Sequence, residues 1–206
     1  GGGGFEALEL PGEFPPEVLA EAEAAARNVS TDPHVAGVTD LREIEFLTID
    51  PAGSLDLDQA MHFERTASGA VLHYAIADVP AFVEPGGAVD AEARLRGQTL
   101  YAADGRIPLH PPALSEDAAS LSPGVDRRAF VWRFTLDHEA RPIETTLTRA
   151  VIRSRHRWSY AEAHAERAHM IFNIVATFGK ESDLRAAYAD ALRSARRAVA
   201  LAPRLP

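Results

Sequence analysis

Three aspartates lie close together in this sequence, and their spacing suits metal-ion chemistry. They are Asp50, Asp56 and Asp58, all within nine residues. Carboxylates gathered in one place raise each other's pKa unless a cation neutralises them. Oxygen ligands of this kind suit Mg²⁺, which typically binds one or two protein carboxylates and completes its shell with water and substrate phosphate. The cluster therefore predicts either a divalent-metal site or a solvated acidic loop.

The segments around these aspartates should bring them together. The apolar residues 46–49 predict a short buried strand, which places Asp50 at its end. Residues 51–54, Pro-Ala-Gly-Ser, predict a turn that can return Asp56 and Asp58 to the same place. A calcium-binding loop fits poorly, because its D-x-D-x-D-G spacing with a glutamate at the twelfth position is absent.

Two β-hairpins are predicted after the acidic stretch. Residues 60–65 and 71–77 flank a turn at 67–69, and residues 127–137 and 142–153 flank a second turn. Within 71–77 the even-numbered positions form a fully apolar face, whereas the odd-numbered positions form a mixed one. Asp78 ends this strand, where it would either orient a ligand of the metal site or cap the next helical turn.

Helices are predicted around the hairpins. The segment from Phe14 to about Asn28 starts with two prolines and an acid, Asp90 is expected to cap a helix that ends near Gly97, and Ser159 opens a capping box. Together these elements predict an α+β fold in which a mixed or antiparallel sheet carries the carboxylates between flanking helices.

Composition limits the class of protein. The chain has 206 residues, 46% of them apolar and none of them cysteine, so disulfides and cysteine metal sites are excluded. The sequence has no run of 18 apolar residues and no signal-peptide pattern, so we expect a cytoplasmic protein with no membrane contact. The net charge is −9, with an acidic excess in residues 1–150 and a basic excess in residues 151–206. The basic part either faces a partner or nucleic acid or, as we expect, forms an arginine-studded solvated helix.

Several ordered motifs over residues 40–160 carry a family resemblance. They are T-I-D at 48–50, D-L-D-Q-A at 56–60, Y-A-I-A-D-V at 74–79, G-Q-T-L-Y at 97–101, I-P-L-H-P at 107–111, L-S-E at 114–116 and A-S-L at 119–121. In this order they resemble the RNB family of 3′→5′ exoribonucleases, which includes ribonuclease II and ribonuclease R. The match covers the first part of that family's catalytic domain.

The resemblance implies an activity and a role for each site residue. The activity is metal-dependent hydrolysis of single-stranded RNA to nucleoside 5′-monophosphates, with Mg²⁺ or Mn²⁺ as cofactor. Asp50 would be the first metal ligand, Asp56 would hold the loop or a metal-bound water, and Asp58 would orient or deprotonate the attacking water. Gln59 stands where the family usually has a fourth, metal-binding aspartate, and offers only a neutral amide oxygen. Tyr101 would stack on an RNA base.

The resemblance also suggests how the chain is divided. We expect a linker and helix over residues 1–39, a partial RNB catalytic domain over 40–165 and a helical segment over 166–206. That last segment is either a helix packed on the domain or the closing helix of a tetratricopeptide-like repeat after a junction near His169, and it would supply any protein partner.

A second function is compatible with the same residues. The chain would be a truncated, inactive homologue that acts as an RNA- or protein-interaction module. The family's later arginine-bearing motifs and its flanking RNA-binding modules are not found in these 206 residues. We therefore expect this chain alone to degrade single-stranded RNA poorly, because positively charged groups that hold the phosphate contribute strongly to catalysis.

Overall fold

The computed structural model describes residues 12–102, 105–166, 193, 194, 196, 197 and 200. The helical segment expected over 166–206 therefore lies almost entirely outside the described residues. Within them, no helix is long and apolar enough to cross a membrane.

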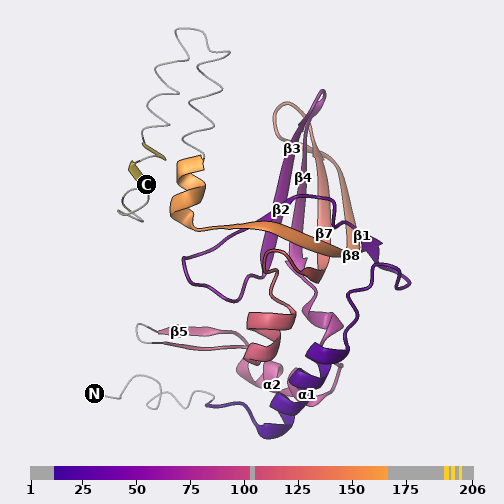
Figure 1. Ribbon diagram of the computed structural model, residues 1–206, viewed down its shortest axis with the longest axis vertical. Coiled ribbons are helices and arrows are strands. Elements are labelled where there is room, and N and C mark those ends of the chain that lie inside the picture. The colour runs from indigo at the N-terminus through magenta and orange to yellow at the C-terminus, as the bar shows by residue number, and fades with distance from the viewer. Residues whose placement is uncertain (1–11, 103–104, 167–192, 195, 198–199, 201–206) are drawn as a thin grey trace.

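A mixed sheet of six strands forms the body of the fold (Figure 1). Its strands are β1 (Thr39–Asp40), β2 (Phe46–Ile49), β3 (Gln59–Thr66), β4 (Gly69–Ala77), β7 (Asp126–Leu136) and β8 (Pro142–Trp158). Their order is β1-β8-β2-β3-β4-β7, with a further pairing between β7 and β8. The predicted α+β class and both predicted hairpins are confirmed.

The long strand β8 closes a ring of five strands, which are β2, β3, β4, β7 and β8 itself. Its first part, as far as Arg153, pairs antiparallel with β7, and its last part, from Ser154 to Trp158, pairs parallel with β2. Since β2, β3, β4 and β7 are joined by antiparallel pairings, β8 connects the two ends of that series. The ring places the end of β2, and with it Asp50, against the end of β8.

Small side chains fill the inside of the ring. The buried cluster there consists of Phe46, Ala60, Ala75, Ala77, Leu121, Ala129, Val131, Ala150 and Ile152. Alanine dominates because a closed sheet of few strands leaves little interior space. The mixed face of β4, with Val71, Ala75 and Ala77, is therefore the buried one, whereas Ile76 on its fully apolar face is 38% exposed.

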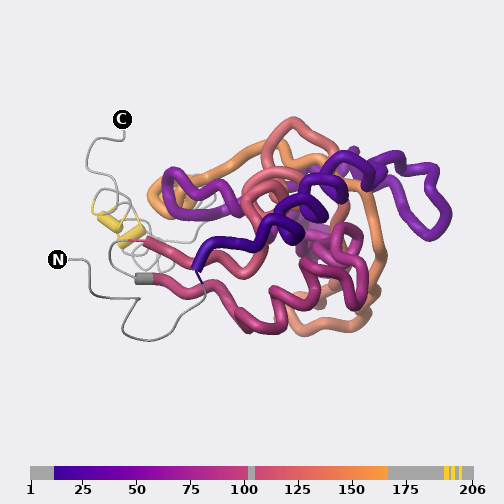
Figure 2. Tube along the Cα trace, turned by 90° about the horizontal axis from the view of Figure 1, so that it is seen from below, coloured from indigo at the N-terminus to yellow at the C-terminus, as the bar shows by residue number. Residues whose placement is uncertain are grey.

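Helices gather at one end of the sheet (Figure 1), and Figure 2 views the chain from that end. They are α1 (Pro16–Asn28), η2 (Val79–Ala81), α2 (Ala88–Arg96) and η3 (Ala113–Ala118). Their buried cluster consists of Val18, Ala22, Phe82, Val89, Leu114, Ala118 and Ala119. The half-buried Val79 packs against this cluster and against the interior of the ring, so the helical end and the sheet share one continuous core.

The capping of α2 differs from the sequence prediction. The first turn of α2 is capped from α1, because the Glu21 carboxylate accepts hydrogen bonds from the backbone N–H groups of Ala88 (2.7 Å) and Val89 (3.2 Å). Asp90 lies inside that turn and accepts from the N–H of Gly86 at 2.9 Å. The prediction was wrong because a carboxylate from a distant helix satisfies the free N–H groups that local sequence assigned to Asp90.

The predicted capping box is confirmed at the start of the helix that follows β8. The Ser159 hydroxyl accepts from the Glu162 N–H at 3.2 Å, and the Glu162 carboxylate accepts from the Ser159 N–H at 2.7 Å. The hairpin formed by β5 (Leu100–Ala102) and β6 (Gly105–Ile107), by contrast, was not predicted. It projects from the helical end of the fold (Figure 1).

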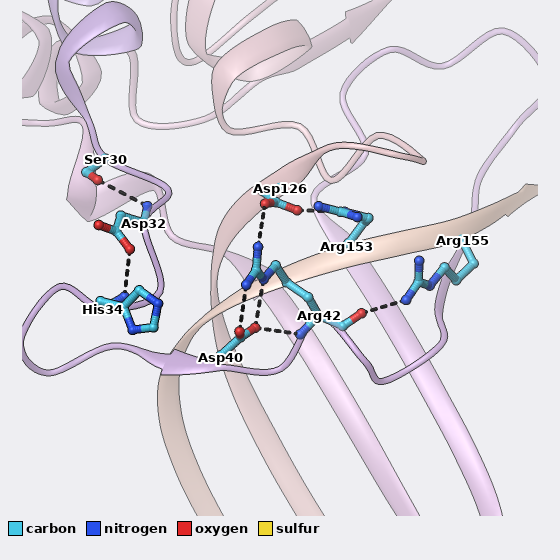
Figure 3. A network of polar contacts seen from close by, with 8 residues as sticks. All are labelled: Ser30, Asp32, His34, Asp40, Arg42, Asp126, Arg153 and Arg155. Atoms are coloured by element: carbon cyan, nitrogen blue, oxygen red, sulfur yellow. Dashed lines mark hydrogen bonds and ion pairs between the residues drawn. The ribbon is translucent and has the colours of Figure 1, made fainter.

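A network of charged groups joins β1 to the closing strands (Figure 3). Arg42 donates to Asp40 at 2.7 and 2.8 Å and to Asp126 at 3.2 Å, while Arg153 donates to Asp126 at 2.7 Å. Arg155 donates to the Arg42 carbonyl at 2.8 Å. Arg153 and Arg155 therefore lie on strand β8 and hydrogen-bond to other residues of the chain. The predicted solvated helix is wrong for this part of the chain.

Candidate active site

Asp50 takes its place from the end of β2. Its backbone N–H donates to the carbonyl of Trp158 at 3.0 Å, which extends the pairing of β2 with β8 by one residue. The residues that follow form a turn in which the Ser54 N–H donates to the Pro51 carbonyl at 3.1 Å. The predicted turn therefore exists, and it carries the chain away from the sheet before Asp56 and Asp58.

The segment with Asp56 and Asp58 is fixed by backbone hydrogen bonds on both sides of Leu57. The N–H of Leu57 donates to the Ser120 hydroxyl at 3.1 Å, and its carbonyl accepts from the N–H of Leu121 at 2.7 Å. The carbonyl of Asp58 accepts from the N–H of Ala77 at 2.9 Å. Leu57 is 1% exposed.

The burial of Leu57 decides where its two neighbours face. In an extended segment successive side chains point to opposite sides, so the anchored Leu57 turns Asp56 and Asp58 to the same side. Both aspartates line one cavity of about 250 Å³. The spacing Asp-Leu-Asp is therefore what presents two carboxylates together.

The cavity lies between the acidic segment, the β5–β6 hairpin and η3. Besides Asp56 and Asp58 its polar lining residues include Tyr101, Arg106 and His110. A hollow of about 440 Å³ at the β3–β4 turn is larger, but Asp137 is its sole carboxylate. The smaller cavity is the better candidate site because it combines two carboxylates with a cation and an aromatic ring.

The charges of the three aspartates act on one another. Partial burial is the main cause that raises the pKa of Asp50, and the charges of Asp58 and Asp56 raise it further, while the charge of Arg157 acts in the opposite direction. The pKa of Asp58 is also raised, first by burial and then by the charge of Asp56, while its own backbone N–H and the Gln59 side chain oppose the shift by hydrogen bonding. A bound cation would relieve this repulsion.

Asp50 and Asp58 are suitable ligands for a magnesium ion. They supply hard carboxylate oxygens whose negative charges repel each other, and Mg²⁺ needs no more than one or two protein carboxylates. No group of three His, Cys, Asp or Glu side chains that could hold a metal occurs among the residues that the structure describes. A metal held by these two carboxylates would need water and phosphate to complete its coordination.

Asp56 has a partner that sequence reasoning missed. Arg106 on β6 donates from Nη1 to the Asp56 carboxylate and from Nη2 to the Glu116 carboxylate. Partial burial acts to lower the pKa of Arg106, but the two carboxylates raise it overall. Arg106 stands directly before the 107–111 motif, and nothing in the sequence signalled its role because the hairpin that carries it was not predicted.

Gln59 is held by a neighbouring strand. The Tyr74 hydroxyl donates to the Gln59 side-chain carbonyl, and the register that pairs Gln59 with Ile76 and Met61 with Tyr74 places both side chains on one face of the sheet. The Gln59 side chain also hydrogen-bonds to Asp58. The amide therefore links β4 to Asp58.

Two further residues escaped the sequence analysis. Ser120, which is 1% exposed, donates to the Leu55 carbonyl at 2.6 Å as well as accepting from Leu57, so it anchors the acidic segment. His110 lines the cavity, where burial lowers the pKa of its imidazole. Both residues lie in motifs that carry the family resemblance, but neither motif has a chemical signature that assigns them a role.

The chain is similar in sequence to known proteins. Residues 38–196 match the RNB domain. Ribonuclease R of Acidithiobacillus ferrooxidans is 37% identical over 156 residues, which are 76% of this chain and 35% of that protein. A protein of Arabidopsis thaliana named inactive exonuclease DIS3L2 is 42% identical over 125 residues, 60% of this chain and 12% of its own length.

A solved structure has the same fold. Mycoplasma genitalium RNase R in complex with ribose-methylated single-stranded RNA superposes with a TM-score of 0.71 at 26% sequence identity, and the alignment covers 93% of this chain and 28% of that one. The chain thus spans about a third or less of the length of these relatives.

Proposed function

The chain belongs to the RNB family, and on that premise we propose that it carries the metal-binding part of the active site of a 3′→5′ exoribonuclease. The substrate is single-stranded RNA and the products are nucleoside 5′-monophosphates. The observation that carries the proposal is that Asp56 and Asp58 line one cavity together with Tyr101 and Arg106. The charges of Asp58 and Asp56 also act on Asp50 and help to raise its pKa. The RNB match over residues 38–196 supports the same conclusion.

Each residue has a chemical role in this proposal. Asp50 and Asp58 hold the metal ion, which when bound supplies positive charge to the phosphate and lowers the pKa of water. The Asp58 carboxylate accepts a hydrogen bond from the attacking water and takes its proton. The water oxygen bonds to phosphorus while the bond from phosphorus to the 3′-oxygen of the preceding nucleotide breaks, and that 3′-oxygen takes a proton from solvent water to become the new 3′-hydroxyl. Tyr101 stacks on a base of the strand and so holds it without regard to sequence.

The test uses oligo-RNA labelled at the 3′ end or the 5′ end, incubated with the chain and Mg²⁺. We expect slow release of labelled mononucleotide from the 3′ end, abolished by EDTA and by Asp58→Asn. Asp32→Asn is the matched control, because Asp32 lies in an exposed loop and an asparagine can still accept the hydrogen bond from the His34 N–H. Cleavage that survives Asp58→Asn but not Asp32→Asn would contradict the proposal.

A second function is favoured by Gln59. A neutral amide held by Tyr74 stands where the family pattern has a metal-binding aspartate, and one relative is named an inactive exonuclease. The chain would then bind single-stranded RNA through the same cavity without hydrolysing it. RNA binding in EDTA, together with no metal-dependent cleavage at any Mg²⁺ or Mn²⁺ concentration, would select this function.

A further inference from the structure

Arg106 connects three separate elements at the edge of the cavity. Its guanidinium lies between Asp56 in the acidic segment and Glu116 in η3, and Arg106 itself belongs to β6. The exposed fractions of the three side chains are 29%, 29% and 25%, so both ion pairs are partly shielded from water. A planar guanidinium that is held by two carboxylates from different elements has a well-defined position.

Tyr101 shares a face of the hairpin with this guanidinium. The β5–β6 register pairs Tyr101 directly with Arg106. Directly opposed residues of an antiparallel pair project from the same face and lie close together. Tyr101 is 74% exposed, so little other packing fixes its ring. Whatever holds Arg106 therefore also sets where Tyr101 stands relative to Asp58 in the shared cavity.

The ion pair also bears on the role of Asp56. Its carboxylate already neutralises a guanidinium, and a divalent cation bound to the same oxygens would be repelled by Arg106. Among the residues that the structure describes, neither Asp50 nor Asp58 forms an ion pair with an arginine or a lysine, whereas Asp56 pairs with Arg106. Asp56 is therefore the one aspartate of the three whose carboxylate is already held by a cation.

We propose that Asp56 and Glu116 are positioning residues that hold Arg106, and through it the β5–β6 hairpin, so that Tyr101 faces the cavity, and that Asp56 is not a metal ligand. The inference rests on the proposed function, in which Tyr101 stacks on an RNA base. Metal affinity and RNA affinity should then depend on different aspartates, although Asp50, Asp56 and Asp58 lie in one motif.

Hydrogen exchange of the hairpin tests the positioning role without RNA or metal. The backbone amides of residues 100–102 and 105–107 should exchange faster in Asp56→Asn, Glu116→Gln and Arg106→Gln than in wild type, because the hairpin loses its anchor. Tyr101→Phe keeps the anchor and should exchange like wild type. Unchanged exchange in all three anchor variants would overturn the proposal.

Two binding measurements test the division of labour. The affinity for a 5′-fluorescein-labelled oligoadenylate is measured in EDTA, and Mn²⁺ binding is measured separately by electron paramagnetic resonance. Asp56→Asn, Arg106→Gln and Tyr101→Ala should each weaken RNA binding about tenfold, and the double variant Arg106→Gln with Tyr101→Ala should bind no more weakly than Tyr101→Ala alone. Mn²⁺ binding should be weakened by Asp50→Asn and not by Asp56→Asn.

The outcomes separate this inference from the proposed function. If Asp56→Asn weakens Mn²⁺ binding as much as Asp50→Asn, Asp56 is a ligand and the inference is wrong. If the wild-type chain binds no oligoadenylate, the RNA-binding part of the proposed function fails, while hydrogen exchange and Mn²⁺ binding still decide the roles of Asp56 and Arg106.

Discussion

Asp78 and Arg149 form a two-pronged ion pair, with Nε to Oδ2 at 2.6 Å and Nη2 to Oδ1 at 2.8 Å, although Asp78 has no exposed surface. Arg128 lies 3.5 Å from the same carboxylate. The sequence allowed Asp78 to cap the next helical turn or to orient a metal ligand. The structure shows no capping hydrogen bond from its side chain to η2 and instead gives it two arginines from β7 and β8.

Replacing Asp78 with asparagine should strongly destabilise the fold. The variant leaves the guanidinium of Arg128, which is 9% exposed, without its carboxylate. Breaking a buried ion pair from one side costs about 3–5 kcal/mol. Urea denaturation should show a loss of about 3 kcal/mol at an unchanged m-value, against less than about 0.5 kcal/mol for the exposed control Asp32→Asn. Equal stability of the two variants would contradict this account of Asp78.

The strands could be predicted from the sequence, whereas the face that each strand buries could not. Alternation in 71–77 gave the strand β4, but its more apolar face is not the buried one. Closure of the ring decides this, because the narrow interior accepts Ala75 and Ala77 more readily than Tyr74 or Ile76. Ring closure depends on β8 pairing with both β7 and β2, which is a relationship between distant segments that local periodicity does not contain.

Only part of the candidate site could be predicted from the sequence, because the rest depends on contacts between distant segments. Asp50, Asp56 and Asp58 could be recognised because they are close in sequence, and the structure brings their charges within range of each other. The other contributors come from distant parts of the chain and reach the site through tertiary contacts; they are Arg106, Glu116 and Ser120. Arg106 and Asp56, for example, are 50 residues apart in the sequence. The assignment of metal ligands remains a prediction.

Ser120 should be necessary for the shape of the acidic segment. Ser120→Ala removes the acceptor of the buried Leu57 N–H and the donor to the partly buried Leu55 carbonyl. Leaving these groups without partners should cost about 1–3 kcal/mol, measured by urea denaturation. Mn²⁺ binding should also weaken, because Asp58 follows directly after Leu57. Ser122→Ala is the control, since Ser122 contacts the Ser120 hydroxyl at 3.2 Å without reaching the segment. An intact Mn²⁺ affinity in Ser120→Ala would show that the segment keeps its shape without this anchor.

The raised pKa of Asp50 predicts how stability depends on pH in the absence of metal. Because its folded-state pKa lies above the value for an unfolded chain, the folded state binds more protons between those two values. The free energy of unfolding therefore falls as pH rises from the usual aspartate pKa through the folded-state pKa, and it stays lower above that window. Asp126, whose pKa is lowered by Arg153 and Arg42, acts in the opposite direction.

Asp50→Asn should therefore stabilise the metal-free protein at neutral pH. Thermal unfolding in EDTA should give a higher midpoint for the variant at pH 7, with the difference vanishing at pH values below the usual aspartate pKa. Addition of Mg²⁺ should raise the midpoint of wild type more than that of the variant, since a ligand stabilises the state that binds it. A variant that is less stable than wild type in EDTA at pH 7 would mean that Asp50 has a favourable partner and is not held near repelling charges.

Gln59→Asp should tighten metal binding. The substitution adds a carboxylate next to Asp58 in place of a neutral amide, and metal affinity rises with the number of charged ligands. The gain is limited, because the shorter side chain gives up the contact with the Tyr74 hydroxyl and the added charge raises the pKa of Asp58 further. We expect roughly tenfold tighter Mn²⁺ binding at pH 7 and a smaller gain at lower pH.

Tyr74→Phe is the control that isolates the charge in this experiment. It frees the Gln59 amide from its hydroxyl partner without adding a carboxylate. If charge decides the affinity, Tyr74→Phe should leave Mn²⁺ binding close to wild type while Gln59→Asp strengthens it. If Gln59→Asp instead weakens binding and Tyr74→Phe does the same, the amide contributes by fixing Asp58 through its hydrogen bond. In that case Gln59 would support metal binding by orienting the Asp58 carboxylate. The aspartate that the family pattern has at this position would instead contribute a fourth negative charge.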